Sequence, residues 1–488
     1  MKRAIAIALL SALAASTAGA ADLLSVYKDA LANDPQIREA DALRKASREV
    51  RPQAWGALLP QITGSGAWTK GETDQTSLQR LPLVDPDTGE SLGNALVPGT
   101  SKFKPDTRQW SFDLRQNVFS WTRWATLRAA DAQVAQAEAD YRTAEQALMQ
   151  RAAQRYFAVL SAQDTLEAQQ TAYEAFNRQL DQSNKRFEVG LIAITDVQDA
   201  KAARDQSAAD VISAKRALAT AEEQLREVTG QKYDRLSRPG ATMPLKSPQP
   251  EIEQEWVETS LDQNPQLLSS RLAADIAREN VRVAFGGHLP TIDIVGTYGN
   301  SKGEGTASFT DNLTGQLTPY LDYPTENNTK TYGIQVTVPI FSGGVTQSRV
   351  REQQFRWIAA KERVTATSRA TERAARDAYL GVISEMSRVE ALRQGLESSQ
   401  TSLKATEAGY EVGTRTSVDV LDSRRLLVQA QTNYSRSKYD YLQNVINLRL
   451  AAGNLDEQTL ADLNTLLTET VPAAPTQPGP PPAQPPAQ

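Results

Sequence analysis

The sequence predicts an α+β membrane protein in which one β-β-α-α unit occurs twice along a chain of 488 residues. Three observations support this prediction. Short motifs recur at a nearly constant spacing, which indicates an internal duplication. Each half contains two segments in which apolar and polar residues alternate, as they do in half-exposed strands. Each half also contains a very long helical stretch that is free of proline.

The N-terminus has the pattern of a secretory signal peptide. Met1-Lys2-Arg3 supplies a basic start, residues 4–13 form an apolar run, and Ala18-Gly19-Ala20 offers a small-residue cleavage site. We therefore expect residues 1–20 to be removed and the mature chain to begin at Ala21. The sequence has no cysteine, so neither a disulfide nor a lipid-modified N-terminal cysteine is expected.

The duplication is visible in proline motifs. Asp34-Pro35-Gln36-Ile37 recurs 230 positions later as Asn264-Pro265-Gln266-Leu267, and Leu59-Pro60 recurs at the same spacing as Leu289-Pro290. Later motifs are spaced by 222 or 223 positions, and the difference falls in the loop between the two strands of each half, where changes of length are tolerated.

These spacings define the expected organisation of the chain. A first structural repeat spans residues 21–238 and a second spans 251–471. The linker 239–250 contains four prolines and cannot continue a helix. The proline-rich remainder, 472–488, is predicted to be disordered.

Helices account for most of each repeat. The first helix covers residues 23–58 or 252–289, with an Asp-Pro or Asn-Pro break near its start. Residues 120–188 contain neither glycine nor proline, so one α-helix of about 100 Å is expected there. Gly190 and Gly413 each end such a helix, and hydroxyl residues then begin the next one. The Ala/Gln/Glu/Arg-rich composition suits helices packed around a lumen, but it also suits a solvated coiled-coil rod.

The strands favour a membrane barrel over a rod. Residues 110–118 alternate apolar and polar side chains without a fault until Gln116, and residues 332–340 keep the same phase throughout; residues 62–68 and 292–298 alternate more weakly. Segments of about 10 alternating residues fit transmembrane barrel strands. Four strands cannot close a barrel, so two or three chains must combine their strands.

Aromatic residues lie at matching positions in both repeats, which an ordinary sandwich strand does not explain. We expect them to form two girdles at the barrel rims, one of Trp68, Trp110, Tyr298 and Tyr332 and the other of Phe119, Trp121 and Phe341. The polar segments 70–106 and 301–330 are expected to be long extracellular loops.

Several classes of function are disfavoured. A net charge of −5 argues against a nucleic-acid partner. His288 is the sole histidine and has no cysteine beside it, so we expect no metal site. No glycine loop for a nucleotide cofactor and no catalytic constellation is recognisable, and we expect neither a cofactor nor an enzyme.

The two glycine turns carry motifs that resemble the TolC family of outer-membrane channel-tunnel proteins. One is Val189-Gly190-Leu191-x-Ala193-Ile194-Thr195-Asp196, and the other is Val412-Gly413-Thr414-Arg415-Thr416 followed by Asp419 and Asp422. The resemblance extends from about Leu23 to about Leu467. It implies a homotrimer in which a twelve-stranded barrel in the outer membrane continues into a twelve-helix periplasmic α-barrel.

The resemblance also implies a function. Such a protein is an exit duct for multidrug efflux, type I protein secretion or both. Its partners are a periplasmic adaptor, or membrane fusion protein, an inner-membrane ABC or proton-driven exporter, and outer-membrane lipid. A periplasmic coiled-coil scaffold or adaptor is the alternative reading of the same long helices.

Gate residues follow from the resemblance as well. It implies that Asp196 hydrogen-bonds Tyr410 and that Arg415 reaches Thr195 and Asp196 of a neighbouring chain. Asp419 and Asp422 lie on one helix face and would form a ring of six carboxylates in a trimer. From the residues alone these aspartates complement a helix N-terminus after Thr416, and Thr195 with Gln198 fits a capping box; the resemblance favours the gate.

Overall fold

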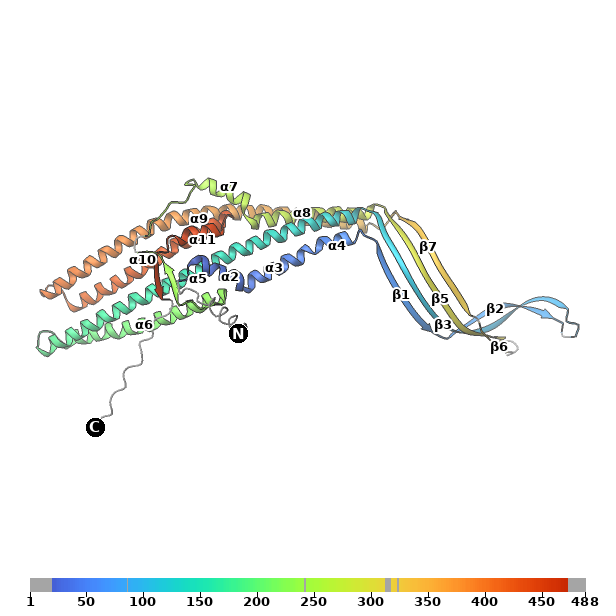
Figure 1. The fold of residues 1–488 in the computed structure, drawn as a ribbon, viewed down its shortest axis with the longest axis horizontal. Helices are drawn as coiled ribbons and strands as arrows, with labels where there is room; N and C mark the ends of the chain where they lie inside the picture. Colours follow the sequence, from blue (N-terminus) through green and yellow to red (C-terminus); the bar gives the residue numbers. More distant parts are fainter. Residues whose placement is uncertain (1–19, 86, 241–242, 312–316, 323, 473–488) are drawn as a thin grey trace, which may run out of the picture. The chain divides into compact units, whose positions relative to one another are not determined.

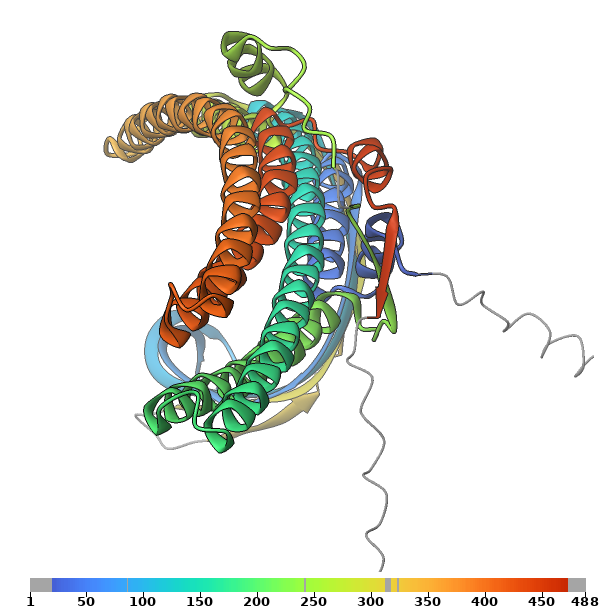
Figure 2. The same ribbon diagram turned by 90° about the vertical axis from the view of Figure 1, so that its left-hand side faces the viewer.

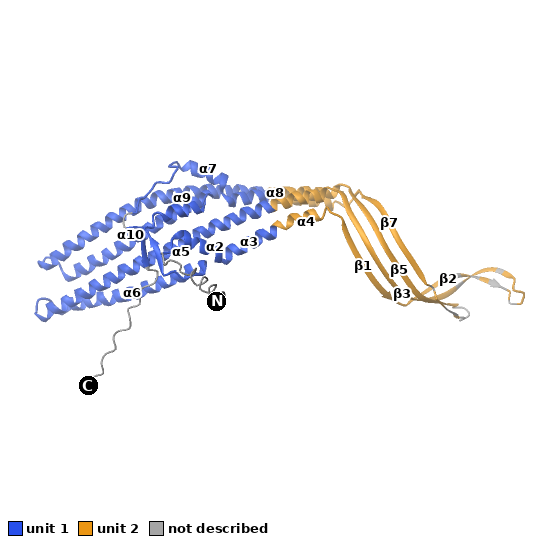
Figure 3. Ribbon diagram, viewed as in Figure 1, with its two compact units in different colours: residues 1–47, 134–274, 360–488 blue, residues 48–133, 275–359 orange. Residues whose placement is uncertain are grey.

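The structure is a computed structural model that describes residues 20–85, 87–240, 243–311, 317–322 and 324–472. The expected signal peptide therefore lies outside the described residues except for Ala20, and so does the proline-rich tail beyond Pro472. The chain divides into two compact units, 1–47, 134–274 and 360–488 in the first and 48–133 and 275–359 in the second (Figure 3). Each unit draws on both sequence repeats, so the compact units do not coincide with the repeats.

Long helices dominate the described chain (Figure 1). The α-helices of the described residues are α2 (Leu23–Asn33), α3 (Pro35–Arg48), α4 (Val50–Gly56), α5 (Trp121–Glu188), α6 (Ile194–Thr229), α7 (Glu253–Gln263), α8 (Pro265–Phe285), α9 (Val345–Glu411), α10 (Ser417–Ala452) and α11 (Glu457–Asn464). The single helix expected over 23–58 is in fact three helices, because Glu49 interrupts it in addition to the expected break at Asp34.

The two repeats contain the same helix break, at Asp34-Pro35 and at Asn264-Pro265. Asp34 and Asn264 both end a short helix in an extended conformation, and the proline that follows each one starts the next helix. The side-chain oxygen of Asp34 accepts the backbone N–H of Ile37 at 3.0 Å, and that of Asn264 accepts the N–H of Leu267 at 3.1 Å. Each side chain thus satisfies an N–H that the first helical turn leaves without a partner.

The core of the first unit is built from α2, α5, α6, α10 and α11. Tyr27, Tyr156, Leu218, Leu442 and Leu460 are fully buried in it. A two-stranded antiparallel ribbon, β4 (Arg235–Arg238) with β8 (Glu469–Pro472), covers this core, and the sequence patterns did not reveal it. Pro472, the first residue of the predicted disordered tail, is paired with Arg235, and the other residues of that tail lie outside the described residues.

The second unit carries a sheet of β1 (Gln61–Lys70), β2 (Thr73–Val84), β3 (Ser91–Ser120), β5 (Thr291–Asp311), β6 (Leu317–Asp322) and β7 (Thr325–Thr337). The two central strands, β3 and β5, pair with each other along one edge of each. The second edge of β3 pairs with β1 and, farther along, with β2. The second edge of β5 pairs with β6 and β7. All these pairs are antiparallel, so the sheet is four strands wide.

The expectation of loops over 70–106 and 301–330 is wrong for most of these residues. β2 pairs with β3 from Thr73 opposite Phe103 to Val84 opposite Ser91, and β5 continues to Asp311. Polar side chains are compatible with a strand when both of its faces are exposed, and alternation of polarity then gives no signal.

The two faces of the sheet differ in polarity. Cross-strand partners share a face, and one face carries apolar or aromatic side chains that are largely exposed, namely Ile62, Trp68, Trp110, Phe112, Leu114, Ile294, Tyr298, Tyr332, Ile334 and Val336. On the opposite face Asp113 accepts hydrogen bonds from Ser111 at 2.9 Å and from Thr297 at 2.8 Å. The sheet is therefore amphipathic, with its apolar side uncovered by any described part of its own unit.

Candidate functional site

The α5–α6 and α9–α10 hairpins end in the same backbone turn. Gly190 has φ +77° and Gly413 has φ +81°, a left-handed conformation that favours glycine. In the first turn the N–H of Leu191 donates to the C=O of Arg186 at 2.9 Å, and in the second the N–H of Thr414 donates to the C=O of Gly409 at 2.8 Å. These are Schellman turns, which satisfy the last carbonyls of α5 and α9.

The helices that leave the two turns begin differently. Thr416 caps α10 in a capping box, in which its Oγ1 accepts the N–H of Asp419 at 3.2 Å and the Asp419 carboxylate accepts the N–H of Thr416 at 2.9 Å. For α6 the cap residue is Ala193, which gives no side-chain cap. The capping box considered for Thr195 and Gln198 is therefore not formed, because Thr195 already lies inside the first turn of α6.

The carboxylates at the start of α10 have local partners. The hydrogen bonds from the backbone and side chain of Thr416 lower the pKa of Asp419 below its ordinary value. Asp422 forms an ion pair of 3.0 Å with Arg425, three residues further along the helix, and remains half exposed. The prediction from the residues alone, that Asp419 complements the start of a helix after Thr416, is thus confirmed.

The two hairpins touch close to their ends. The guanidinium of Arg186, in the last turns of α5, lies over the ring of Tyr410, in the last turn of α9, with 4.8 Å between its Cζ and the ring centroid. The hydroxyl of Tyr410 is buried and finds no hydrogen-bond partner among the described residues. The bond expected between Asp196 and Tyr410 is therefore not formed within this single chain.

Arg415 follows the second turn and is exposed. Its side chain lies across Gly409, where an added Cβ would come within 2.8 Å of Arg415 Cγ. Thr195 is also exposed, and Asp196 is partly buried in the first turn of α6. The structure gives positions for all four expected gate residues, whereas the sequence offered no separate signal for Arg186.

Apolar side chains are exposed around both turns. They are Phe187, Val189, Leu191, Ile194, Val412 and Val418. Leu191 is 73% exposed and Val412 75% exposed. Large apolar groups gathered at one place on a surface mark a site of interaction with another molecule.

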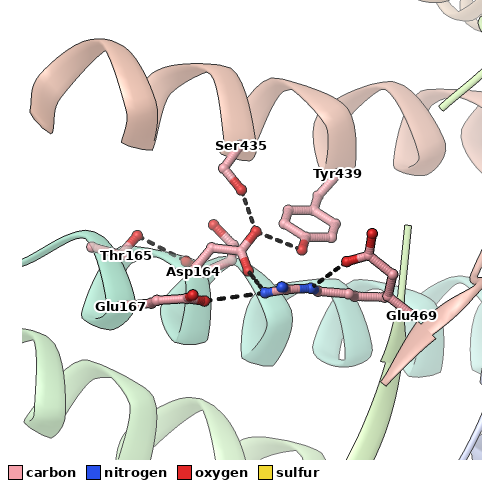
Figure 4. A network of polar contacts seen from close by, with 8 residues as sticks. Asp164, Thr165, Glu167, Ser435, Tyr439 and Glu469 are labelled. Atoms are coloured by element: carbon pink, nitrogen blue, oxygen red, sulfur yellow. Dashed lines mark hydrogen bonds and ion pairs between the residues drawn. The ribbon is translucent and has the colours of Figure 1, made fainter. Parts of the chain in front are cut away.

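Farther from the turns, a polar network joins α5 to α10 and to the β4–β8 ribbon (Figure 4). The carboxylate of Asp164 in α5 accepts a hydrogen bond of 2.8 Å from the Tyr439 hydroxyl in α10, and a second one from Ser435. Arg238 in β4 contacts Asp164 and Glu167 at 3.2 Å and Glu469 in β8 at 3.1 Å. Burial and the neighbouring Asp164 raise the pKa of Tyr439 well above its ordinary value.

Between this network and the turns, a small apolar cluster lies between the hairpins. It contains Ala172 and Phe176 from α5, Ala203 from α6 and Leu421 from α10. Figure 2, viewed toward the turns, shows the two hairpins side by side. The α9–α10 hairpin thus contacts α5 through polar groups at Asp164 and through apolar groups nearer the turns.

The expected aromatic girdle residues lie on the sheet in a regular stagger. On β1, Trp68 lies opposite residue 108 of β3, and on β5, Tyr298 lies opposite residue 112 of β3. On β7, Tyr332 lies across β5 from residue 114 of β3. Together with Trp110 on β3 itself, the four aromatic residues are therefore offset by two residues from each strand to the next. The rings of Trp110 and Tyr298 meet edge to face with centroids 5.5 Å apart. Phe119 lies near the opposite end of β3, and Phe341 follows β7; both are exposed.

No group of three or more histidine, aspartate or glutamate side chains is arranged to hold a metal ion in the part of the chain that the structure describes. Within the same residues, no helix combines the length and the apolar composition needed to cross a membrane.

The chain is similar to known outer-membrane and secretion proteins over nearly its whole length. Outer membrane protein TolC of Vibrio cholerae is 34% identical over 451 residues, which cover 92% of this chain and 94% of that protein. Alkaline protease secretion protein AprF of Pseudomonas aeruginosa is 27% identical over 444 residues, 90% of this chain and 85% of that one. The fold matches the Campylobacter jejuni CmeC outer membrane channel with a TM-score of 0.69 at 18% identity, over 91% of this chain and 89% of CmeC.

The sequence profile of the outer membrane efflux protein family matches residues 26–231 and 256–454, which together make up most of the chain. The resemblance expected from the motifs at Gly190 and Gly413 is confirmed. The chain belongs to the outer membrane efflux protein family.

Proposed function

We propose that this protein is one subunit of an outer-membrane exit duct through which small molecules, secreted proteins or both leave the cell. The observation that carries the proposal is the amphipathic sheet. Its exposed apolar face, with Ile334 at 73% exposure, suits contact with lipid, and its polar face suits a water-filled lumen.

The barrel is formed by several copies of the chain. The outer edges of β1 and β7 pair with no other described strand, and an unpaired edge in lipid would leave backbone groups unsatisfied. Three copies of a sheet four strands wide supply twelve strands. The stagger of two residues per strand among Trp68, Trp110, Tyr298 and Tyr332 keeps these rings at one height in a tilted barrel, as a girdle requires.

The hairpin ends form the periplasmic entrance and its gate. Thr195, Asp196, Tyr410 and Arg415 hold the ends together between neighbouring hairpins and chains, and Asp419 and Asp422 form a carboxylate ring that favours cations. Exposed polar links contribute no more than about 1 kcal/mol each, which suits a gate that another protein opens. The exposed apolar residues around Gly190 and Gly413 receive a periplasmic adaptor, which connects the duct to an inner-membrane exporter.

The cargo class rests on the named relatives. AprF is an alkaline protease secretion protein and the matched family is that of outer membrane efflux proteins, so both secretion and efflux remain within the proposed function. Energy comes from the exporter, because the proposed duct itself performs no chemistry.

The test combines location with conductance. The protein should fractionate with outer membranes and form ion channels in planar bilayers, whereas a periplasmic scaffold would be soluble and form none. In the channel, Asp419→Asn with Asp422→Asn should reduce cation selectivity, read from the zero-current potential in a salt gradient. Asp377→Asn is the matched control, because Asp377 also forms a 3.0 Å ion pair on a helix but lies far along α9 from the turn.

A further inference from the structure

We infer that the apolar face of the sheet binds the phosphate groups of lipopolysaccharide through a row of basic side chains directly beyond the aromatic rings. This basic row consists of Lys70, Arg108, Lys302 and Lys330, one residue on each of β1, β3, β5 and β7. The inference rests on the proposed exit duct and names the lipid group that its barrel binds. All four residues belong to the second compact unit.

The pairing register places the basic row beyond the rings on the same face. Each base follows the aromatic residue of its own strand on the side away from α4, in the pairs Trp68 and Lys70, Trp110 and Arg108, Tyr298 and Lys302, and Tyr332 and Lys330. The offset is two residues, or about 7 Å, on three strands and four residues, or about 13 Å, on β5. An even offset along a strand keeps two side chains on one face.

The rest of the sheet at these levels carries no such charge. Within the described strands, the residues next to the four bases lie on the polar face, and each is glycine, serine, threonine or glutamine. From the rings toward α4, the apolar face has no charged side chain in the described strands. The order of apolar, aromatic and then basic side chains along one face matches the hydrocarbon, the interface and the phosphate groups of a lipid leaflet.

The positive charge of the basic row is only partly compensated within the chain. Lys70 and Lys302 each contact one carboxylate, whereas Arg108 and Lys330 form no ion pair with any described residue. Arg108 lies directly opposite Lys302 in the β3–β5 register, and like charges in that position repel each other. The carboxylate partner of Lys302 is on β7, on the side away from β3. An anion bound between Arg108 and Lys302 removes this repulsion.

Lysines immediately farther out on β3 have partners of their own. Lys104 pairs with Glu72 at 3.4 Å, and Lys102 pairs with Asp74 at 3.9 Å. Arg108 has no such carboxylate, although it lies on the same strand and the same face. The pairing therefore changes at the step that adjoins the rings.

Lipid phosphate suits this position chemically. An arginine side chain can donate two parallel hydrogen bonds to phosphate oxygens. Lys330 extends past the Tyr298 ring, with 5.5 Å between its Nζ and the ring centroid, so its charged end is held at the edge of the apolar surface. In the proposed duct the helices are periplasmic, and the end of the sheet away from α4 therefore meets the outer leaflet. Lipopolysaccharide supplies phosphate groups there, joined to acyl chains that cover the apolar face.

The experiment titrates purified full-length protein in detergent with lipopolysaccharide that carries phosphorylated lipid A. Arg108→Gln and Lys330→Gln should each raise the apparent Kd about fivefold, and together about 25-fold, the effect expected of bases near an anionic lipid surface. Arg108→Lys, which keeps the charge, should restore most of the binding. Lys201→Gln with Lys215→Gln is the control, because it removes equal charge from exposed positions on α6 and should leave the Kd unchanged.

The chemical source of the phosphate is tested separately. Lipopolysaccharide stripped of its lipid A phosphates should bind the parent protein and the Arg108→Gln, Lys330→Gln variant equally weakly. Inorganic phosphate at the same concentration as the lipid should not compete, because it has no acyl chains. Competition by inorganic phosphate would overturn the inference in favour of a free-anion site. An equal loss of binding in the α6 control would overturn it in favour of net charge.

Further measurements on the parent protein separate this inference from the proposed duct. Parent protein that conducts in planar bilayers and fractionates with outer membranes, but prefers phosphorylated lipid no more than the double variant does, contradicts this inference alone. Parent protein that neither conducts nor fractionates with outer membranes contradicts the duct itself. Equal melting temperatures of parent and variants exclude misfolding as the cause of a weaker affinity.

Discussion

The Tyr439 hydroxyl in α10 donates a hydrogen bond of 2.8 Å to the carboxylate of Asp164 in α5. Asp164 is nearly buried and also meets Arg238 from β4. Three segments that are far apart in the sequence therefore meet at one carboxylate. In the proposed duct this point holds the α9–α10 hairpin to its neighbour while the hairpin end moves.

Removing this bond should weaken the first unit. We expect Tyr439→Phe to lower the melting temperature, since a hydrogen bond to a charged group contributes about 1.5–3 kcal/mol. Tyr434→Phe serves as the control, because Tyr434 lies one turn earlier on α10 and its ring, which lies 5.5 Å from Lys438 Nζ, is retained. Equal melting temperatures for the two variants would show that the Asp164 bond adds no stability.

Gly413 in the turn after α9 and Gly395 within α9 should respond in opposite directions to substitution by alanine. Gly413 has φ +81°, so Gly413→Ala places a side chain in the left-handed region at a cost of about 1–2 kcal/mol. Gly395 lies within the helix, and nothing stands within 4 Å of an added Cβ, so Gly395→Ala should stabilise by about 1 kcal/mol. Thermal denaturation of both variants tests this. A stabilising Gly413→Ala would contradict the role given to the turn.

Neighbouring residues on β7 should differ in their tolerance of charge. Ile334 lies on the apolar face and Gln335 on the polar one. A lysine facing lipid costs about 2–4 kcal/mol at the middle of the bilayer, so Ile334→Lys should reduce the amount of protein assembled in outer membranes. Gln335→Lys should assemble normally. The reverse order would mean that the apolar face does not meet lipid.

The start of α10 should loosen only in strong acid. The Thr416 hydrogen bonds lower the pKa of Asp419, so its contribution is present above the pKa of an unfolded aspartate and is lost as the pH falls through the lowered value. We expect protection of the backbone amides of residues 416–420 from hydrogen exchange to be constant from neutral pH to about pH 4 and to fall below it. An Asp419→Ala variant should lack this acid-dependent step. A step near neutral pH would assign the change to another group.

Contact with an adaptor should depend on the apolar hairpin ends. Leu191→Ser with Val412→Ser removes two exposed apolar groups and disturbs no packing, so the variant should still form channels in bilayers. Export from cells should fall, because recruitment of the duct fails. Loss of channel formation together with export would instead indicate a defect in assembly.

Much of this architecture was readable in the sequence. Gly190 and Gly413 marked the two turns, since glycine readily takes the left-handed conformation that a Schellman turn requires. Alternation of apolar and polar residues from Trp110 to Arg115 predicted a strand and indicated which of its side chains lie on the apolar face of the sheet and which on the polar face. That pattern fails where β3 has an irregularity near Val118, and the shift in pairing there returns Phe119 to the face of Ile292.

Other elements left no local signal. β2 and the outer parts of β3 and β5 are mainly polar and contain scattered apolar residues, such as Leu78 and Leu96, without regular alternation, so neither period nor composition separated them from loops. The β4–β8 ribbon is only four residues long in each strand, too short for periodicity to be detected. The additional helix break at Glu49 involves neither glycine nor proline.

Sequence by itself determined the duplication, the long helices, their glycine turns and the apolar face of the strands, because each depends on residues close together in the chain. Tertiary structure alone decided that Arg186 meets Tyr410 and that Asp164 meets Arg238 and Tyr439. These partners are separated by 74 to 275 positions in the sequence. A local sequence pattern does not indicate which distant side chains come into contact. The packing of the helices brings these residues together.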